Sequence, residues 1–262
     1  GLFIVHAGPG AEQTGNDNHV WSHQWSIPTT LNLDGVNLRD YSMEPEEYQG
    51  IGIMTMGVFA HEYGHYLGLP DLYDTDYSSS GVGDWSLMAG GSWNANGSRP
   101  AFFDAWCKSQ LGFLNPVNIE ANMLDVDIPG SYDSAVAYRL WSGGSTGPQY
   151  FLIENRQAIG YDAPIPSSGL LIYHVDETQG GNQDEWHPLV GIEQADGRTD
   201  LQDGTNDGDG GDVWSALTAS TFDDLSLPSS RTYGGASTGT AVWNMSAPGE
   251  VMSANFDVDF WR

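Results

Sequence analysis

The strongest constraint on the fold of this 262-residue chain is a pair of histidines four residues apart, His61 and His65. On an α-helix, residues i and i+4 share one face with Cβ atoms roughly 5–6 Å apart, so both imidazoles can bind a single metal ion. Imidazole nitrogen is a preferred ligand of zinc. Glu62 follows the first histidine, and its carboxylate can take a proton from a water on the open side of the metal. The pattern predicts a long helix from Ile51 to Leu69 that carries a catalytic zinc site.

The residues after His65 supply a candidate third ligand. Gly68 can take the left-handed conformation that ends a helix and turns the chain sharply. Asp71 then points back toward the two histidines, and Pro70 stiffens the turn that holds it. A catalytic zinc takes three protein ligands and leaves its fourth position to water. HExxH alone could equally be a solvated polar helix face, so it is this sequel that favours a metal site.

A second motif follows, in which Met88 lies in a Trp-Ser-Leu-Met-Ala-Gly-Gly-Ser-Trp run that ends at Trp93. A methionine in a tight turn under a metal site is a packing element and not a ligand. Together with HExxHxxGxPDxYD at residues 61–74, this run resembles the immune inhibitor A family of secreted bacterial zinc metallopeptidases, within the metzincin clan. Further blocks similar to that family extend the resemblance over nearly the whole chain: Val5–Gly8, Trp21–Trp25, Glu154–Gln157, Gly169–Glu177 and Gln194–Gly197.

The resemblance implies a set of site residues: zinc ligands His61, His65 and Asp71, general base Glu62, and Met-turn residue Met88. Some metzincins place a tyrosine two residues after the methionine to stabilise the oxyanion, but this chain has Gly90 there. The resemblance therefore leaves the oxyanion-stabilising donor unidentified. It also implies an α+β fold class, with a metzincin-like zinc-protease catalytic domain and its active-site helix, followed by a mostly antiparallel β module.

The chain is expected to divide near residue 114. Residues 1–114 would form the catalytic domain, in which residues 8–50 read as loops with short strands and a helix runs through Ala101–Leu111. The sequence opens on the buried-strand pattern of Gly1–His6. The resemblance implies an upstream propeptide or a missing N-terminal segment with further strands.

Residues 115–262 would form a β-rich module packed on the catalytic domain. Short β-type runs recur there between Gly, Pro and Ser breaks, and no helix of comparable length is evident. The predicted strands are Leu124–Ile128, Ala135–Trp141, Tyr150–Glu154, Gly169–Val175, Leu189–Glu193 and Val251–Phe260.

The chain is strongly acidic, with 35 acidic against 8 basic residues and a formal charge of −27. Such a surface would repel nucleic acid and anionic membranes, and no run is long and apolar enough to span a bilayer. The acidity suggests either solubility alone or attraction to basic substrates. The single cysteine, Cys107, excludes an intrachain disulfide.

A dense acidic loop from residue 196 to residue 212 is a candidate calcium site. Calcium takes six to eight oxygen ligands, and aspartates separated by glycines let a tight loop wrap them around the ion. The run does not fit an EF-hand, so the candidate ligands Asp200, Asp207, Asp209 and Asp212 are chosen by spacing alone. The alternative is a disordered, solvated loop.

A second pair of histidines four residues apart, His19 and His23, could also bind a metal. No acidic general base accompanies this pair, so a structural role is favoured.

These observations predict a secreted, extracellular zinc-dependent endopeptidase that acts on protein or peptide substrates, with zinc and calcium as cofactors. The alternative is a catalytically silent, calcium-stabilised adhesion or binding module that keeps a degenerate protease half. A glycosidase with paired carboxylates is a third reading, but it leaves the arrangement of His61, Asp71 and Met88 unexplained.

Overall fold

The computed structural model describes residues 1–48, 50 and 52–259. Its helices and strands are β1 (Leu2–Pro9), α1 (Ala11–Thr14), β2 (His23–Leu33), β3 (Val36–Tyr48), β4 (Gly52–Ile53), α2 (Met56–Tyr66), α3 (Ala105–Gln110), β5 (Val117–Asn118), β6 (Met123–Pro129), β7 (Tyr138–Leu140), β8 (Gln149–Arg156), β9 (Gly169–Asp176), β10 (Val190–Ile192), β11 (Thr221–Phe222), β12 (Ala241–Trp243) and β13 (Val251–Asp257). Short 3₁₀ helices add to these, among them η1 (Gly83–Trp85) and η2 (Gly90–Trp93).

The predicted fold class is wrong. The sequence predicts an α+β chain with a metzincin-like catalytic domain, whereas the described residues are mostly β, with 31% strand against 13% helix and three sheets. Residues 8–50, expected to be loops with short strands, contain the long strands β2 and β3. The helix expected through Ala101–Leu111 has only six residues, because Asp104 caps its start by accepting a hydrogen bond from the backbone N–H of Cys107. The helix expected from Ile51 begins at Met56, and Ile51 itself lies outside the described residues.

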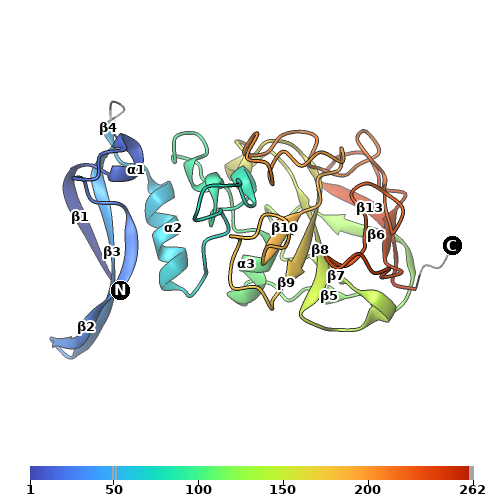
Figure 1. Cartoon of the computed structure of the whole chain (residues 1–262), viewed down its shortest axis with the longest axis horizontal. Coiled ribbons are helices and arrows are strands. Elements are labelled where there is room, and N and C mark those ends of the chain that lie inside the picture. Colours follow the sequence, from blue (N-terminus) through green and yellow to red (C-terminus); the bar gives the residue numbers. More distant parts are fainter. Residues whose placement is uncertain (49, 51, 260–262) are drawn as a thin grey trace.

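The N-terminal sheet has the order β1-β3-β2, with β4 paired to β3. Strands β2 and β3 form a hairpin whose two turn residues, Asp34 and Gly35, have φ values of 53° and 83°. This positive-φ pair is the Asp-Gly combination that tight hairpin turns favour. One face of the sheet packs on α2, where the Phe3 ring lies 6.3 Å from Phe59 and 5.9 Å from Tyr63. Figure 1 shows this sheet at one end of the molecule, with α2 beside it.

The second half contains two sheets packed face to face, with strand orders β10-β9-β8-β7-β5 and β11-β12-β13-β6. Strand β8 alternates between two buried faces: Phe151 and Ile153 pack toward the other sheet, whereas Leu152 packs toward the helix-and-loop region. Each of the six runs predicted after residue 115 contains a strand. The last was expected to reach Phe260, which lies outside the described residues, and its strand ends at Asp257.

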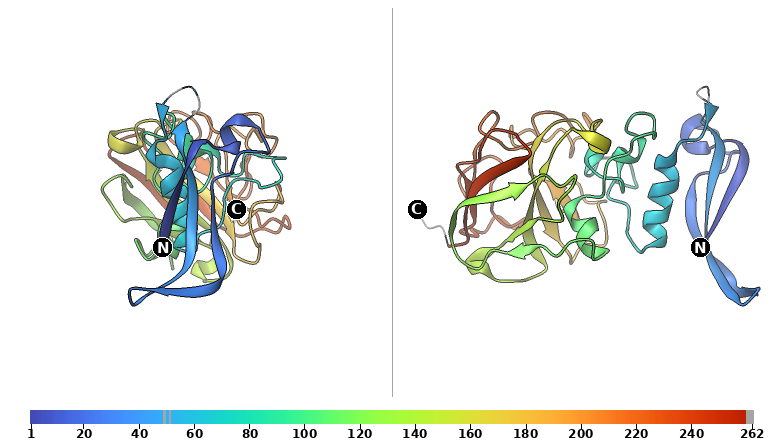
Figure 2. Two further views of the ribbon diagram at one scale, coloured as in Figure 1. Left: turned by 90° about the vertical axis from the view of Figure 1, so that its left-hand side faces the viewer. Right: turned by 180° about the vertical axis from the view of Figure 1, so that it is seen from behind.

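The sheet with the order β10-β9-β8-β7-β5 packs against the loops that follow α2. One buried cluster joins Trp85 and Met88 to Leu152 and Tyr173, so it draws residues from both sides of position 114. Figure 2 shows these loops between α2 and the two packed sheets. Among the helices that the structure describes, none combines the length and the apolar character needed to cross a membrane.

Candidate metal centre

Helix α2 carries both histidines on the face that meets the loops. It ends after Tyr66, where Leu67 is still right-handed and Gly68 takes a φ of 101°. Few residues other than glycine adopt this conformation, so Gly68 redirects the chain as its sequence position predicts. The N–H of Leu69 then donates to the carbonyl of Gly64 at 3.1 Å, which closes the turn and brings Asp71 back toward the helix.

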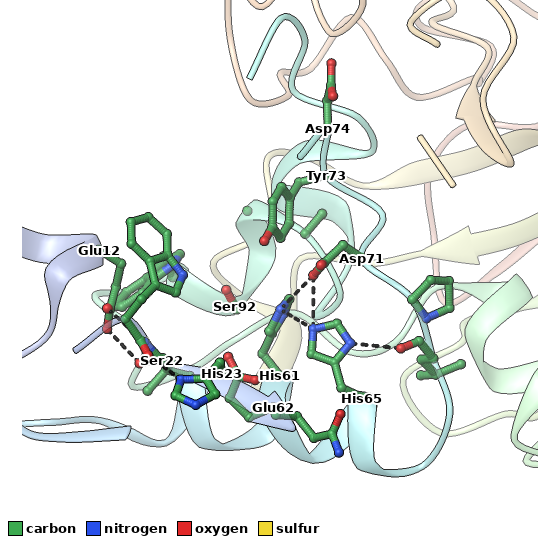
Figure 3. A pocket seen from close by; sticks show the side chains of 18 of the residues that line it. Glu12, Ser22, His23, His61, Glu62, His65, Asp71, Tyr73, Asp74 and Ser92 are labelled. Atoms are coloured by element: carbon green, nitrogen blue, oxygen red, sulfur yellow. Dashed lines mark hydrogen bonds and ion pairs between the residues drawn. The ribbon is translucent and has the colours of Figure 1, made fainter. Parts of the chain in front are cut away.

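Three side chains converge at this turn (Figure 3). Asp71 Oδ1 lies 3.1 Å from His61 Nε2 and 3.0 Å from His65 Nε2, and the two Nε2 atoms are 3.1 Å apart. Within the described part of the chain, this is the one group of at least three His, Cys, Asp or Glu side chains whose ligand atoms all lie within 4.8 Å of one another. The structure therefore brings together the three residues that the sequence predicts as ligands.

The hydrogen bonds of the two imidazoles fit a metal. His61 Nδ1 lies 2.8 Å from the carbonyl oxygen of Leu87, and His65 Nδ1 lies 2.8 Å from that of Leu69. A carbonyl can only accept, so each Nδ1–H donates, and each neutral imidazole presents the lone pair of Nε2. These lone pairs and the Asp71 carboxylate point at one another, an arrangement that a shared cation relieves. Metal-binding histidines usually have such carbonyl partners, and two imidazoles with one carboxylate suit zinc.

The turn at Met88 lies directly beneath the helix. Met88 is fully buried, and its carbonyl accepts a hydrogen bond from Leu72 N–H at 2.8 Å. The preceding residue, Leu87, provides the carbonyl that orients His61. A Cβ built on Gly64 would collide with the Met88 sulfur, so the glycine lets the turn approach the helix. Met88 thus packs below the ligand set and is not part of it.

Glu62 faces the cleft beside the ligand set. Glu62 is buried, and among the described residues its Oε2 has no hydrogen-bond partner. Burial raises the pKa of Glu62, an effect that the nearby His61 and His65 oppose. A buried, unpartnered carboxylate oxygen is costly unless a ligand or water satisfies it, which makes this atom a candidate proton acceptor. The cleft has a volume of about 880 Å³ and is also lined by His23 and Tyr73.

A second orphan carboxyl lies behind Glu62. Glu44, on β3, is fully buried, and by geometry neither of its oxygens has a hydrogen-bond partner among the described residues, although the nearby Ser42 hydroxyl opposes the rise in its pKa. Burial raises the pKa of Glu44 from 4.5 to about 7, and the nearby Glu62 adds to the rise. The acid form of Glu44 is therefore the form that the fold favours. No pattern in the sequence indicated this, because the segment around Glu44 reads as a loop.

Replacing Glu44 by glutamine should make stability less dependent on pH. A group whose folded-state pKa is raised stabilises fully below its unfolded pKa and loses that contribution as pH rises through the folded value. From pH 4.5 to pH 8, we expect the wild type to lose about 3 kcal/mol relative to Glu44→Gln. Urea unfolding of both proteins across this range measures the difference. The exposed Glu47→Gln is the matched control, and parallel curves for wild type and Glu44→Gln would contradict the expectation.

The walls of the cleft come from segments that the sequence analysis did not connect. Glu12 and Ser22 lie across the cleft from the ligand set (Figure 3), and the loop that follows β10 contributes Gly204 and Asp207. The N–H of Asp84, in η1, donates to the carbonyl of Asp207 at 2.6 Å, which ties this loop to the turn before Met88. Such contacts join residues more than 100 positions apart and have no local sequence signal.

The four predicted calcium ligands do not form a group whose carboxylate oxygens all lie within 4.8 Å of one another. Asp212 Oδ2 accepts hydrogen bonds from Trp85 Nε1 at 2.8 Å and from Asp209 N–H at 2.9 Å. Asp209 Oδ1 accepts from Gly211 N–H at 2.6 Å, whereas Asp200 lies 3.8 Å from Arg198. Burial raises the pKa of Asp212 to about 6. The calcium site remains a prediction.

Comparisons with known proteins match the part of the chain that contains this site. Residues 1–113 match the family described as immune inhibitor A peptidase M6, catalytic domain. The chain is 40% identical over 121 residues to Immune inhibitor A of Bacillus thuringiensis subsp. alesti, a match that covers 39% of this chain and 17% of that protein. It is 36% identical over 129 residues to Pre-pro-metalloprotease PrtV of Vibrio cholerae serotype O1, covering 42% of this chain and 13% of PrtV.

The chain therefore matches less than one fifth of the length of either relative. The similar blocks after residue 113 lie outside the family match. The matched residues 1–113 include all the predicted zinc-site residues: His61, His65, Glu62, Asp71 and Met88. Over residues 1–113, this chain is therefore similar to the catalytic domain of the immune inhibitor A peptidases.

Proposed function

We propose that this chain is the catalytic part of a secreted zinc endopeptidase that cleaves protein substrates. The observation that carries the proposal is the convergence of His61, His65 and Asp71 beside the unpartnered Glu62 oxygen, at the floor of a large cleft. One relative is named a metalloprotease, which supports metal-dependent peptide hydrolysis. Secretion is part of the proposal through the resemblance to secreted peptidases, and the name Pre-pro-metalloprotease of one relative is consistent with it.

In the proposed mechanism, the imidazoles of His61 and His65 and the Asp71 carboxylate would hold the metal. Zinc, when bound, supplies a Lewis acid that lowers the pKa of water and polarises the scissile carbonyl. Glu62 takes a proton from the attacking water at its free Oε2 and passes it to the leaving amine nitrogen. The Leu87 and Leu69 carbonyls keep each imidazole in the tautomer whose Nε2 can bind the metal.

Metal removal tests the proposal. We expect a zinc chelator to abolish cleavage of casein, an unstructured protein substrate, and added zinc to restore it. Elemental analysis should find bound zinc in the wild type and much less in Asp71→Ala, because that variant loses one of three ligands. Bound zinc without any casein cleavage would contradict the peptidase and favour a catalytically silent binding module.

We also propose that the loop from residue 196 to residue 212 binds calcium through Asp200, Asp207, Asp209 and Asp212. Burial and the nearby Asp207 raise the pKa of Asp84 to about 6, so a cation here would relieve repulsion between carboxylates. Thermal unfolding with and without a calcium-selective chelator tests this proposal, and an unchanged unfolding temperature would count against calcium.

We also propose a structural boundary near residue 114, where the chain changes from helix α2 and its loops to β strands.

A further inference from the structure

A fixed carboxylate stands in the cleft wall opposite the metal ligands. Glu12, in α1, lies across the cleft from Asp71 (Figure 3). Its Oε1 accepts a hydrogen bond from Ser22 Oγ at 2.7 Å, and its Oε2 accepts one from Ser22 N–H at 3.2 Å. A carboxylate has about four acceptor sites, so both oxygens keep capacity for another donor. Ser22 therefore positions the Glu12 carboxylate without neutralising it.

Gly10 makes room for this carboxylate. A Cβ built on residue 10 would collide with both Glu12 oxygens. The backbone there is ordinary, with a φ of −78°, so an alanine would be tolerated by the backbone and excluded only by the carboxylate. Gly10 therefore leaves space for the acid, and the two hydrogen bonds from Ser22 position it.

The charges around the cleft leave Glu12 without a cation. Five carboxylates line the cleft among the described residues, and no lysine or arginine does. Asp71 belongs to the ligand set, and Asp74 accepts hydrogen bonds from Ser78 and Ser79. Glu12 has no such set of donors beyond Ser22.

Aromatic side chains complete this part of the wall. Trp21, Trp25 and Trp93 line the same cleft as Glu12. Indole faces attract a lysine or arginine cation and pack against its aliphatic stem. The unpartnered Glu62 oxygen, buried in the same cleft, marks where the reacting part of a ligand would lie.

We propose that Glu12 forms a subsite for a basic side chain, lysine or arginine, of the substrate. The proposal rests on the peptidase function proposed above and names the substrate class of that site. A substrate with its scissile carbonyl at the metal centre places one flanking side chain against the opposite wall, where Glu12 accepts the cation. The net charge of −27 adds a long-range attraction for basic chains.

Pairs of peptides test the subsite. The two members of a pair are identical except at one position, where one has lysine and the other has the uncharged norleucine. Each position on either side of the scissile bond is varied in this way in turn. At one position we expect the wild type to give a kcat/KM about tenfold higher for lysine, a ratio that falls as salt rises. Glu12→Gln should bring that ratio close to one. Gly10→Ala keeps every charge but displaces the carboxylate, so it should also lower the ratio.

Glu47→Gln is the matched control, since it removes the same charge from an exposed position of the N-terminal sheet outside the cleft. It should keep the full lysine ratio. A wild-type ratio near one at every position, or an equal loss in Glu47→Gln, would overturn the subsite while leaving the peptidase intact. If the wild type cleaves no peptide, the peptidase fails instead. Calorimetric binding of the lysine and norleucine peptides to wild type and Glu12→Gln then decides the subsite alone.

Discussion

Glutamine in place of Glu62 is expected to lower the kcat for casein cleavage by about 10²- to 10⁴-fold, the usual contribution of a general base. The amide has the size of the carboxylate but cannot take a proton from water. Glu62 is not one of the three convergent ligands, so the variant should retain its zinc. The buried position of Glu62, 5% exposed beside His61, means that bulk buffer cannot easily replace it.

Turnover and metal content must be measured on the same preparations. Glu47→Gln, which alters an exposed acid of β3, should retain wild-type turnover and zinc. Loss of zinc from Glu62→Gln would mean that the carboxylate supports metal binding and not proton transfer. Near-normal turnover in the variant would remove Glu62 from the proposed mechanism.

Leucine in place of Arg156 is expected to cost about 3–5 kcal/mol of stability, the usual result of leaving a buried charge without its partner. Arg156 is fully buried. Its Nε and Nη2 donate to Asp162 Oδ2 at 2.9 and 2.7 Å, and its Nη1 donates to the carbonyl of Trp85 at 2.8 Å. Because Trp85 lies three residues before Met88, the loss should also loosen the turn beneath the ligand set.

Urea unfolding measures this cost, and Arg198→Leu is its control. Arg198 is 69% exposed at its side chain and lies 3.5 Å from Asp196, so its loss should cost less than about 1 kcal/mol. The double variant of Arg156→Leu with Asp162→Asn removes both charges and should recover part of the stability. Equal effects of Arg156→Leu and Arg198→Leu would show that the buried network contributes little.

The convergence of the three candidate ligands was largely predictable because its determinants are local. The spacing of His61 and His65, the glycine that ends the helix and the return of Asp71 all lie within eleven residues. The structure brings these side chains together as that spacing predicts, and residues 1–113 match the immune inhibitor A family. The strands of the second half were also predictable, since their apolar runs are bounded by turn residues.

The rest depended on contacts between distant segments. The hairpin of β2 and β3 was missed although Asp34-Gly35 is a recognised turn signal, because the glycine-, asparagine- and proline-rich composition around it favoured loops. Without that hairpin, the mostly β character of the chain could not be inferred. The cleft wall was missed for a different reason. Asp207 reaches it through the packing of its loop on η1 and on Ser80, which no local pattern encodes.

The fit of Gly64 against Met88 has a consequence for the evolution of this site. The HExxH pattern leaves the position before the second histidine open, but in this protein any side chain there would displace the Met88 sulfur. Substitution at residue 64 must therefore be accompanied by a smaller residue or a new turn at residue 88. Directed-evolution libraries that vary the helix alone would then recover glycine at this position, whereas libraries that vary both positions together could reach alternative pairs.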